Sequence, residues 1–397
     1  MRWGFKKSFE LYGIPANLYV IPPSLSDKIE NLVNSIKNGI GSIIISGPMG
    51  SGKTSLISFL KNKVKNEKIV ILSANAVGSL SYLAEQFALN KIYHNQTYRE
   101  FLKEKYGVYI PSYGSGRLIF SRLMQGMRTD SENRKVRYLL IIDEFKPLLW
   151  ARSDIRRSVI EHLAHIVNDR TSEDIRYTNI LLSLIQRPDQ DTNQVFDQFL
   201  TISTKKTNIE RSTFARRFRD IVSLFYNELD ISIIGSHNIL NAKEINPNTI
   251  KEEEFIKLLK PFTFEALIYA ARMSGRNPGF CMLLLDDALR EVENNLRNMN
   301  IDPDKIEIDE KIIDTVSKKR FENERKQLTE DQIRFLQYLE NPRKTNEIAL
   351  RLNSLKIPPD QIEIFISDLQ NRGLIEKNTD NSITTTLLWS KGSKYGI

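Results

Sequence analysis

The chain has 397 residues, of which 41% are hydrophobic and 27% are charged, and its formal net charge is +8. Such a length predicts two or three domains, and the composition is typical of a globular protein rather than of a disordered chain. No apolar run approaches the roughly 18 residues of a membrane helix, so we expect no membrane span.

The cysteine content and the first residues bear on the compartment. Cys281 is the only cysteine, so neither an intrachain disulfide nor a thiolate metal cluster is possible. Residues 1–13 include basic residues but no apolar segment of the kind that a secretory signal contains. We therefore expect a cytoplasmic protein. The basic excess lies in residues 1–150, which would attract a polyanion, although a lysine-rich surface also serves solubility alone.

The segment 42–56 has the order of a phosphate-binding loop. Residues 42–46, SIIIS, predict a short buried parallel strand. The next eight residues, GPMGSGKT (47–54), match the pattern G-x-x-x-x-G-K-[ST]. Apolar residues then recur at helical spacing, at Leu56, Ile57, Leu60 and Val64. Strand, glycine loop and helix in this order predict a nucleotide site.

Each part of this loop has a chemical role. Glycines allow successive N–H groups to face phosphate oxygens, helped by the positive end of the helix. Lys53 is expected to reach the β- and γ-phosphates, and the Thr54 hydroxyl to ligate Mg²⁺. The expected cofactors are ATP and Mg²⁺, and the predicted binding residues are Gly47, Pro48, Met49, Gly50, Ser51, Gly52, Lys53, Thr54 and Ser55.

Three further strands are predicted to complete the sheet around this site. The segment 68–75, KIVILSAN, is one of them, and RYLLIIDEF (137–145) ends in Asp143 and Glu144. Because ligands bind at the carboxyl ends of parallel strands, Asp143 is expected to hold the magnesium ion and Glu144 to act as general base.

The segment 178–186, TNILLSLIQ, predicts the last of these strands. It ends on Gln186, whose amide is expected to orient the attacking water. Ser183 is the alternative for this role, and an amide that only caps a loop is the non-catalytic reading.

With these motifs in place, the sequence resembles the AAA+ ATPases, and in particular the initiator group that includes the origin-recognition proteins of archaea. The resemblance covers residues 18–395. It is carried by YVIPPSLSDKIENLVNSIKNGIGSIIISGPMGSGKT (19–54) and by GVYIPSYGSGRLIFSRLMQGMR (107–128). It implies an α/β fold in which helices sandwich a parallel P-loop sheet in residues 1–240. A helical lid (241–325) and a C-terminal winged helix (326–397) would follow.

The resemblance also implies two arginine roles. The segment STFARRFRDI (212–221) resembles an arginine-finger segment, in which Arg217 would reach the γ-phosphate of a neighbouring subunit and so imply self-assembly. A solvated basic helix face is the alternative for this segment. ARMSGRNPGFCMLLLDDAL (271–289) resembles the sensor-2 helix of the lid, with Arg276 as the sensor.

The last part of the chain reads as three helices followed by two strands. The helices are expected in 328–340, 344–352 and 358–373, and the strands in 374–390, around a polar turn. This order resembles a winged helix. The expected recognition helix carries Asp360, Glu363 and Asp368, with Arg372 as its one basic residue near the end, so contact with a protein is as open as contact with DNA. Lys391 and Lys394 could still contact a DNA backbone.

The segment 101–137 of the core is the other predicted DNA surface, because basic residues and Tyr98, Tyr106, Tyr109 and Tyr113 lie in or beside it. The leading hypothesis is an ATP-binding and ATP-hydrolysing protein that assembles on double-stranded DNA in replication initiation. The alternatives are a mobile-element regulator or partner-remodelling ATPase that contacts a protein through its winged helix, and a nucleotide sensor that hydrolyses slowly.

Overall fold

The computed structural model describes residues 3–6, 9, 19–39, 41–65, 68–75, 77–93, 96–144, 152–186, 218–246, 250, 252–297, 306–344, 347–348, 357, 359–378 and 382–393. Among the helices in these ranges, none combines the length and the apolar composition that a membrane span requires.

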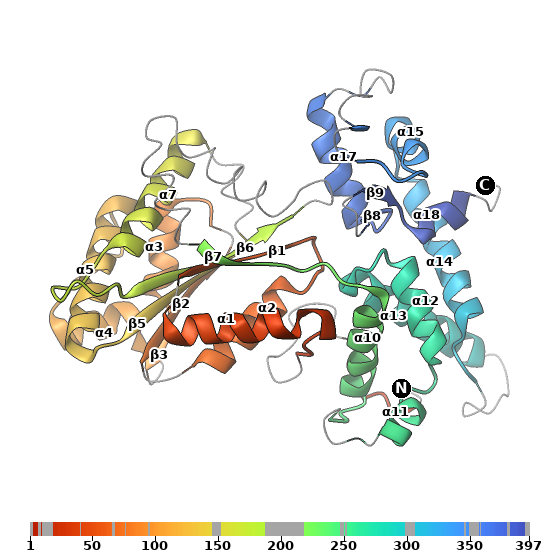
Figure 1. The fold of residues 1–397 in the computed structure, drawn as a ribbon, viewed down its shortest axis with the longest axis horizontal. Helices are drawn as coiled ribbons and strands as arrows, with labels where there is room; N and C mark the ends of the chain where they lie inside the picture. Colours follow the sequence, from red (N-terminus) through yellow and green to blue (C-terminus); the bar gives the residue numbers. More distant parts are fainter. Residues whose placement is uncertain are drawn as a thin grey trace.

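The described strands of the core form one five-stranded parallel sheet in the order β2-β5-β6-β1-β7 (Figure 1). The bounds are Ser42–Gly47 for β1, Ile69–Asn75 for β2, Arg137–Asp143 for β5, Thr178–Ile185 for β6 and Phe218–Ser223 for β7. The predicted strands are therefore present, and the predicted α/β fold class with a parallel P-loop sheet is confirmed.

Successive residues of β1 pack on opposite helical layers, as the strand period of two requires. Ile43 and Ile45 share a buried cluster with the first layer, α1 (Ser26–Asn38) and α2 (Lys53–Val64). Ile44 belongs to a second cluster, which includes α3 (Leu80–Ala88), α4 (Tyr98–Tyr106), α5 (Gly116–Arg134) and α7 (Ser153–Asn168). The sheet is thus covered on both faces. Shorter elements complete this part: η2 (Pro23–Leu25), β3 (Lys91–Tyr93) and β4 (Gln96–Thr97).

The strand β7 was not among the predicted strands. It occupies the end of the segment interpreted as an arginine-finger segment, and it pairs with β1 from Ser42 onward. A helical reading of the whole segment 212–221 is therefore wrong from Phe218 onward. Residues 212–217, including Arg217, lie outside the described residues.

Helices follow the sheet, and we use the name lid for α10 to α14, which begin before the predicted limit of residue 241. Its helices are α10 (Glu228–Ala242), α11 (Glu252–Leu258), α12 (Phe264–Met273), α13 (Pro278–Arg297) and α14 (Glu310–Arg325). Helix α10 packs on α12 and α13, and α14 packs on the same pair. Asp230, in the first turn of α10, accepts hydrogen bonds from the backbone and hydroxyl of Ser24, so the chain before α1 is joined to the lid.

The C-terminal module, by which we mean the described part of residues 326–397, has helices α15 (Glu330–Tyr338) and α17 (Pro359–Asn371). An antiparallel hairpin, β8 (Ile375–Lys377) and β9 (Ile383–Thr385), follows, and then helix α18 (Leu387–Gly392). Most of the segment 344–352 lies outside the described residues. The predicted limits of the three parts, 1–240, 241–325 and 326–397, remain a prediction.

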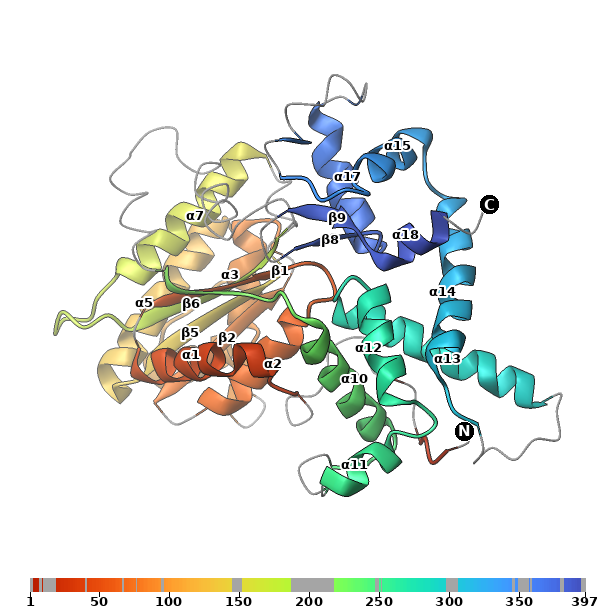
Figure 2. The same ribbon diagram turned by 45° about the vertical axis from the view of Figure 1, so that its right-hand side comes forward.

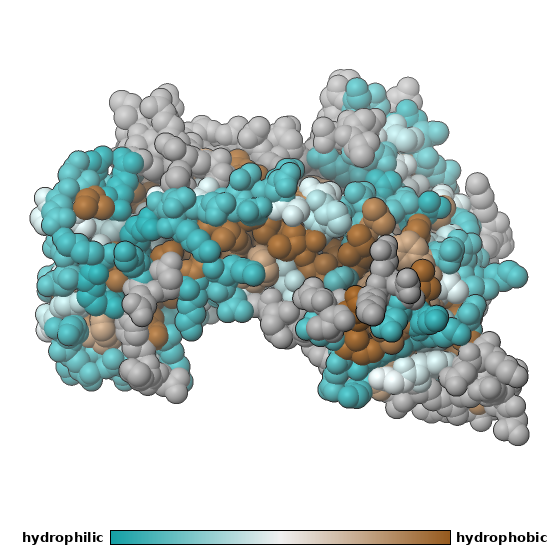
Figure 3. Space-filling model, turned by 60° about the horizontal axis from the view of Figure 1, so that its bottom comes forward, coloured by the Kyte–Doolittle hydropathy of each residue, from teal (hydrophilic) through white to brown (hydrophobic). Residues whose placement is uncertain are grey.

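The predicted extension of the second strand to residue 390 is wrong, because α18 begins directly after β9. In this helix Leu388 and Trp389 are buried, and the Trp389 ring lies edge-on to Phe321 of α14, with 5.6 Å between the ring centroids. Packing against the lid thus determines the helical conformation. Figure 2 shows the module beside the lid, with α18 close to α14. In the view of Figure 3, hydrophobic residues gather where the core meets the lid.

Candidate nucleotide-binding site

The loop between β1 and α2 is curled by two glycines. Gly50 and Gly52 have φ angles of 77° and 83°, in the left-handed region that glycine adopts without strain. Inside the loop the Ser51 N–H donates to the Pro48 carbonyl at 3.3 Å. The loop therefore has the conformation in which several N–H groups can converge on an anion at the start of α2.

A hydroxyl and a carboxylate meet beside this loop. The Thr54 Oγ1 donates to the Asp143 Oδ2 over 2.8 Å, although the two residues come from α2 and from the end of β5. The Asp143 side chain is buried. Two hard oxygen donors at this distance fit a magnesium ion, which prefers carboxylate, hydroxyl and water oxygens. The predicted pairing of these two residues is therefore present in the structure.

Lys53 lies against the inside of the same loop. Its ammonium group donates to the carbonyls of Gly47 and Pro48, at 2.9 and 2.6 Å. Burial lowers the pKa of Lys53 to about 8, while the carboxylates of Asp143 and Glu144 act in the opposite direction. A desolvated cation next to the loop is the group that phosphate oxygens would attract most strongly.

Glu144 follows directly on β5 and is exposed to solvent. Its φ angle is 51°, which is uncommon for a residue with a Cβ, and its N–H donates to the Asp143 Oδ1 at 3.0 Å. The chain therefore turns sharply at the end of β5. This turn separates a buried carboxylate, Asp143, from an exposed one, Glu144, at the edge of the sheet where the loop lies.

Gln186 lies next to the loop, immediately after β6. Its N–H donates to the Gly47 carbonyl at 3.0 Å, and its Oε1 accepts from Ser46 at 2.8 Å and from Ser223 at 3.2 Å. The side chain is buried and held by β1 and β7. Ser183, the alternative residue, pairs with Ile45 deeper in the sheet. Gln186 is thus the nearer of the two to the loop.

Sequence comparison finds one family model that is similar to part of the chain. Residues 36–185 match the family described as "AAA domain". The match includes the glycine loop, both carboxylates and the strand that precedes Gln186, and no curated protein matches the chain.

Two solved structures are similar to this chain at low sequence identity. One is the ORC2 protein of Aeropyrum pernix in its ADPNP and ADP complexes, with 12% identity, 95% of this chain and 96% of that chain covered, and a TM-score of 0.49. Another is the RuvB Holliday junction branch migration motor of Thermotoga maritima, with 14% identity, both chains covered to 100%, and a TM-score of 0.48.

The lid contacts the glycine loop through residues that the sequence did not indicate. Asn277 donates from its side-chain Nδ2 to the Met49 carbonyl at 2.7 Å, and the Gly279 N–H donates to the Gly50 carbonyl at 3.1 Å. Asparagine followed by proline is a common start of a helix, and α13 begins at Pro278. The sequence indicates such a cap but not its partner in the loop.

Arg276 lies beside the glycine loop, yet its charge faces the C-terminal module. Its Nε is 3.7 Å from the Glu376 carboxylate, and its φ angle is 58°. Arg276 lines a recess together with Pro48 and Ser51 of the loop and with Glu376 of β8. The predicted sensor is therefore near the loop but forms its ion pair with β8.

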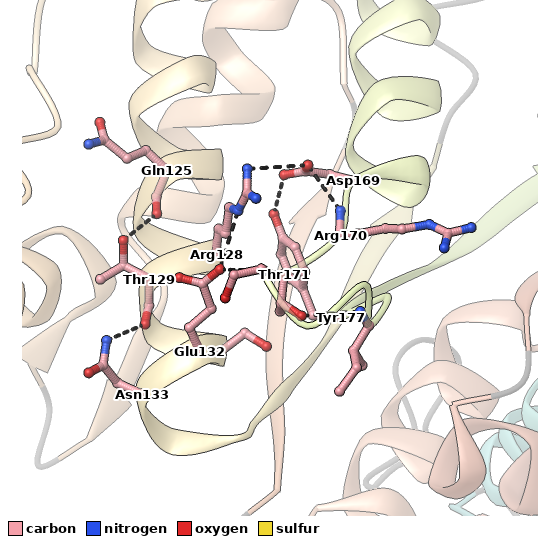
Figure 4. Close-up of polar contacts among 12 residues, drawn as sticks. Gln125, Arg128, Thr129, Glu132, Asn133, Asp169, Arg170, Thr171 and Tyr177 are labelled. Carbon is pink, nitrogen blue, oxygen red and sulfur yellow. Dashed lines mark hydrogen bonds and ion pairs between the residues drawn. The ribbon is translucent and has the colours of Figure 1, made fainter.

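The basic segment 101–137 is only partly available as a surface. Arg128 forms ion pairs with Glu132 and Asp169 (Figure 4), at 3.5 and 3.9 Å. The Asp169 carboxylate also accepts a hydrogen bond from the Tyr177 hydroxyl, at 2.7 Å. Other basic residues in this segment are also engaged: Arg134 with Asp130, Lys135 with Glu173, and Arg137 with the Lys37 carbonyl.

The four tyrosines of this region divide into two pairs. Tyr98 is fully buried and donates to the Tyr138 hydroxyl at 2.7 Å, and Tyr106 donates to the buried Asp130 at 2.7 Å. Burial excludes a stacking role for Tyr98, while Tyr106 is only half-buried and its role stays a prediction. Tyr109 and Tyr113 are 62% and 91% exposed, so these two remain as candidates for stacking.

Proposed function

We propose that this chain binds ATP with Mg²⁺ at residues 47–54, hydrolyses the nucleotide, and assembles on double-stranded DNA as an initiator-like protein. The nucleotide part rests above all on the 2.8 Å hydrogen bond between Thr54 and Asp143, next to the ammonium group of Lys53. A hydroxyl, a carboxylate and a cation beside a curled glycine loop are the groups that a magnesium triphosphate requires.

The roles of the residues follow from their positions. Bound Mg²⁺ would neutralise charge on the phosphate oxygens, and Thr54 and Asp143 would hold it. Lys53 would exchange its two carbonyl acceptors for phosphate oxygens. Glu144 accepts the proton of the attacking water, because its exposed carboxylate lies at the same edge of the sheet. Gln186 orients that water from the end of β6.

Two variants test the nucleotide part. Lys53→Ala should abolish binding of a fluorescent ATP analogue in the presence of Mg²⁺, since the loop then loses its only lysine. Glu144→Gln should bind the analogue as the wild type does but release no phosphate. Unchanged affinity in the first variant, or undiminished turnover in the second, would remove the assignment of that residue.

Self-assembly is proposed through Arg217, on its resemblance to an arginine finger. A finger acts on the nucleotide of the neighbouring subunit, so Arg217→Ala and Glu144→Gln subunits carry defects in different sites. Mixing the two inactive variants should restore part of the ATPase activity, because some sites then combine an intact finger with an intact Glu144. Mixtures without activity would leave the finger unsupported.

Double-stranded DNA is proposed to contact the core at Tyr109, Tyr113 and the exposed basic residues Lys103, Lys105 and Arg117. A footprint on DNA in the presence of a nonhydrolysable ATP analogue, repeated over a series of salt concentrations, tests this surface. Arg117→Ala should reduce the slope of log affinity against log salt by about one, as expected for a lost phosphate contact. Ser112→Ala, an uncharged change at a nearby exposed residue, is the control, and an equal slope in both variants would exclude Arg117 from the surface.

A second candidate function is favoured for the C-terminal module, namely contact with a protein partner. Arg372, directly after α17, donates to Glu324 at 3.1 Å and to Asp368 at 3.0 Å, and Lys391 donates to Asp314 at 3.3 Å. Two of the cations expected near DNA, Arg372 and Lys391, therefore face carboxylates within the chain, and Lys394 lies outside the described residues. Arg372→Ala tests this candidate. If the module contacts a protein and not DNA, this variant should leave the DNA footprint unchanged.

Arg276 is retained as the proposed sensor of the γ-phosphate. In this role it would leave Glu376 and turn toward the loop, whose Pro48 and Ser51 line the same recess. Arg276→Ala should then lower turnover at saturating ATP. An unchanged turnover would assign Arg276 to packing of the C-terminal module alone.

A further inference from the structure

The tip of the glycine loop is held from outside by two hydrogen bonds. The Asn277 Nδ2 donates to the Met49 carbonyl and the Gly279 N–H donates to the Gly50 carbonyl, at 2.7 and 3.1 Å. Both acceptors are loop carbonyls, and both donors lie at the start of α13: Asn277 directly precedes this helix, and Gly279 is in its first turn. We call these residues the lid turn. Asn277 is not among the residues that are proposed above to bind or hydrolyse the nucleotide.

These bonds determine how two peptide planes of the loop are oriented. A trans peptide is planar, and its C=O and N–H point in opposite directions. A Met49 carbonyl directed at the lid therefore directs the Gly50 N–H away from the lid. In the same way, the bond from Gly279 directs the Ser51 N–H into the loop, where it also meets the Pro48 carbonyl. N–H groups that face inward are the ones that can bind phosphate.

The contact is close and depends on two residues without side chains. A Cβ on Gly50 would lie 2.8 Å from the Asn277 Oδ1, and a Cβ on Gly279 would lie 3.3 Å from the Gly50 Cα and carbonyl oxygen. Distances of this kind exclude a larger side chain at Gly50 without displacement of Asn277. The backbones of the glycine loop and of the lid turn are therefore in direct contact, with no room for a side chain between them.

Both ends of the Asn277 amide are used. Its Oδ1 accepts from the Phe280 N–H at 3.1 Å and caps α13, while its Nδ2 donates to the loop. A rotation of the amide by half a turn would break both bonds. The C-terminal module supports the turn from behind, since the Phe280 ring packs on Gly373 and the Arg276 side chain pairs with Glu376.

We propose that Asn277 is a positioning residue for the phosphate loop, which holds the peptide planes of residues 49–51 in the orientation that binds the nucleotide. This inference rests on the proposed binding of ATP at the same loop. The proposal makes the lid turn a part of the nucleotide site. The lid turn would affect the affinity for the nucleotide and not the rate of the chemical step.

The decisive variant is Asn277→Ser. Serine is as good a helix cap as asparagine, but its shorter side chain does not extend to the Met49 carbonyl, and it adds no charge near the phosphates. Loss of one neutral hydrogen bond predicts about 2- to 10-fold weaker binding of a fluorescent ATP analogue with Mg²⁺. The kcat at saturating ATP should stay at the wild-type value, while KM rises by the same factor as the dissociation constant.

The matched control is Thr263→Ala, which removes the cap of α12 in the same lid. Thr263 accepts from the Ala266 N–H at 3.1 Å and has no contact with the loop among the hydrogen bonds of the described residues. This variant should be less stable but should bind the nucleotide normally. If both variants weaken binding equally, the effect comes from lid stability and the proposal is wrong.

A second measurement needs no nucleotide and therefore separates this proposal from the proposed function. In the free protein, hydrogen exchange of the peptide that spans residues 47–54 should be several-fold faster in Asn277→Ser than in the wild type, since the loop loses a support. Equal exchange rates would overturn the positioning role. A wild-type protein that fails to bind ATP, with exchange still faster in the variant, would instead reject the proposed function and keep the support of the loop.

Discussion

Glu376 provides the most direct test of how the C-terminal module is attached to the lid. Its side chain on β8 is only 13% exposed, and the Arg276 Nε lies 3.7 Å from its carboxylate. Burial raises the pKa of Glu376 to about 6, Arg276 acts in the opposite direction, and Glu228 acts in the same direction as burial. The charged form of Glu376 is therefore disfavoured in the folded protein even with its partner present.

The size of this effect follows from the pKa values. A rise from the ordinary 4.5 to about 6 corresponds to roughly 2 kcal/mol, at about 1.4 kcal/mol per pH unit. The folded state binds the proton more tightly than the unfolded state does. The corresponding stability is therefore fully present below about pH 4.5 and is lost as the pH rises through about 6. At pH 7.5, Glu376→Gln should remove this cost and stabilise the folded protein by up to about 2 kcal/mol.

The assay is urea unfolding of wild type and Glu376→Gln at about pH 4 and at pH 7.5, followed by circular dichroism. The difference in the free energy of unfolding should be near zero at the lower pH and should favour the variant at the higher one. Glu340→Gln, at an exposed glutamate after α15, is the control and should show no pH-dependent difference. A Glu376→Gln protein that is less stable than the wild type at pH 7.5 would refute the reasoning, because the ion pair with Arg276 would then outweigh the burial.

Two further predictions concern the buried contacts of the lid and of the core. Phe321→Ala should cost about 3–5 kcal/mol in the free energy of unfolding, since the ring is buried against Trp389, and a cost below about 1 kcal/mol would show that α18 repacks. Tyr138→Phe should cost about 1–3 kcal/mol, because the buried Asp130 loses a hydroxyl donor, and an unchanged midpoint in urea would show that Tyr106 and Arg134 satisfy this carboxylate alone.

The sheet and the phosphate site could be predicted because both are encoded in short, continuous segments. The strand 42–46, the loop 47–54 and the following helix are adjacent in sequence, so local periodicity and glycine spacing suffice. Asp143 could be predicted for a related reason, since a carboxylate at the end of a buried parallel strand must lie at the same edge of the sheet as the loop.

The strand β7 could not be predicted in the same way. Its sequence, FRDIVS, contains an arginine and an aspartate, so it lacks the continuous apolar run of the inner strands. An edge strand has one neighbour, here β1, and its composition is correspondingly less constrained. Helix α18 was missed because its strand-like sequence becomes helical only through burial of Leu388 and Trp389 against the lid.

Asn277 and Arg276 show why the lid side of the site was less accessible to sequence reasoning. The bond from Asn277 joins residues 228 positions apart, and no local pattern contains both partners. The resemblance to a sensor-2 helix directed attention to Arg276, whose charge is engaged by Glu376. The neighbouring residue, with a neutral side chain, makes the contact to the loop.

The same turn links the loop to the C-terminal module, and this arrangement has a mechanical consequence. Asn277 and Gly279 bond to loop carbonyls on one side, while Arg276 and Phe280 contact β8 and Gly373 on the other. Close-packed protein interiors have a low compressibility, so they transmit a displacement from one residue to the next. A nucleotide that shifts the loop by a fraction of an ångström would therefore move the hairpin of the C-terminal module, with the lid turn as the connecting element.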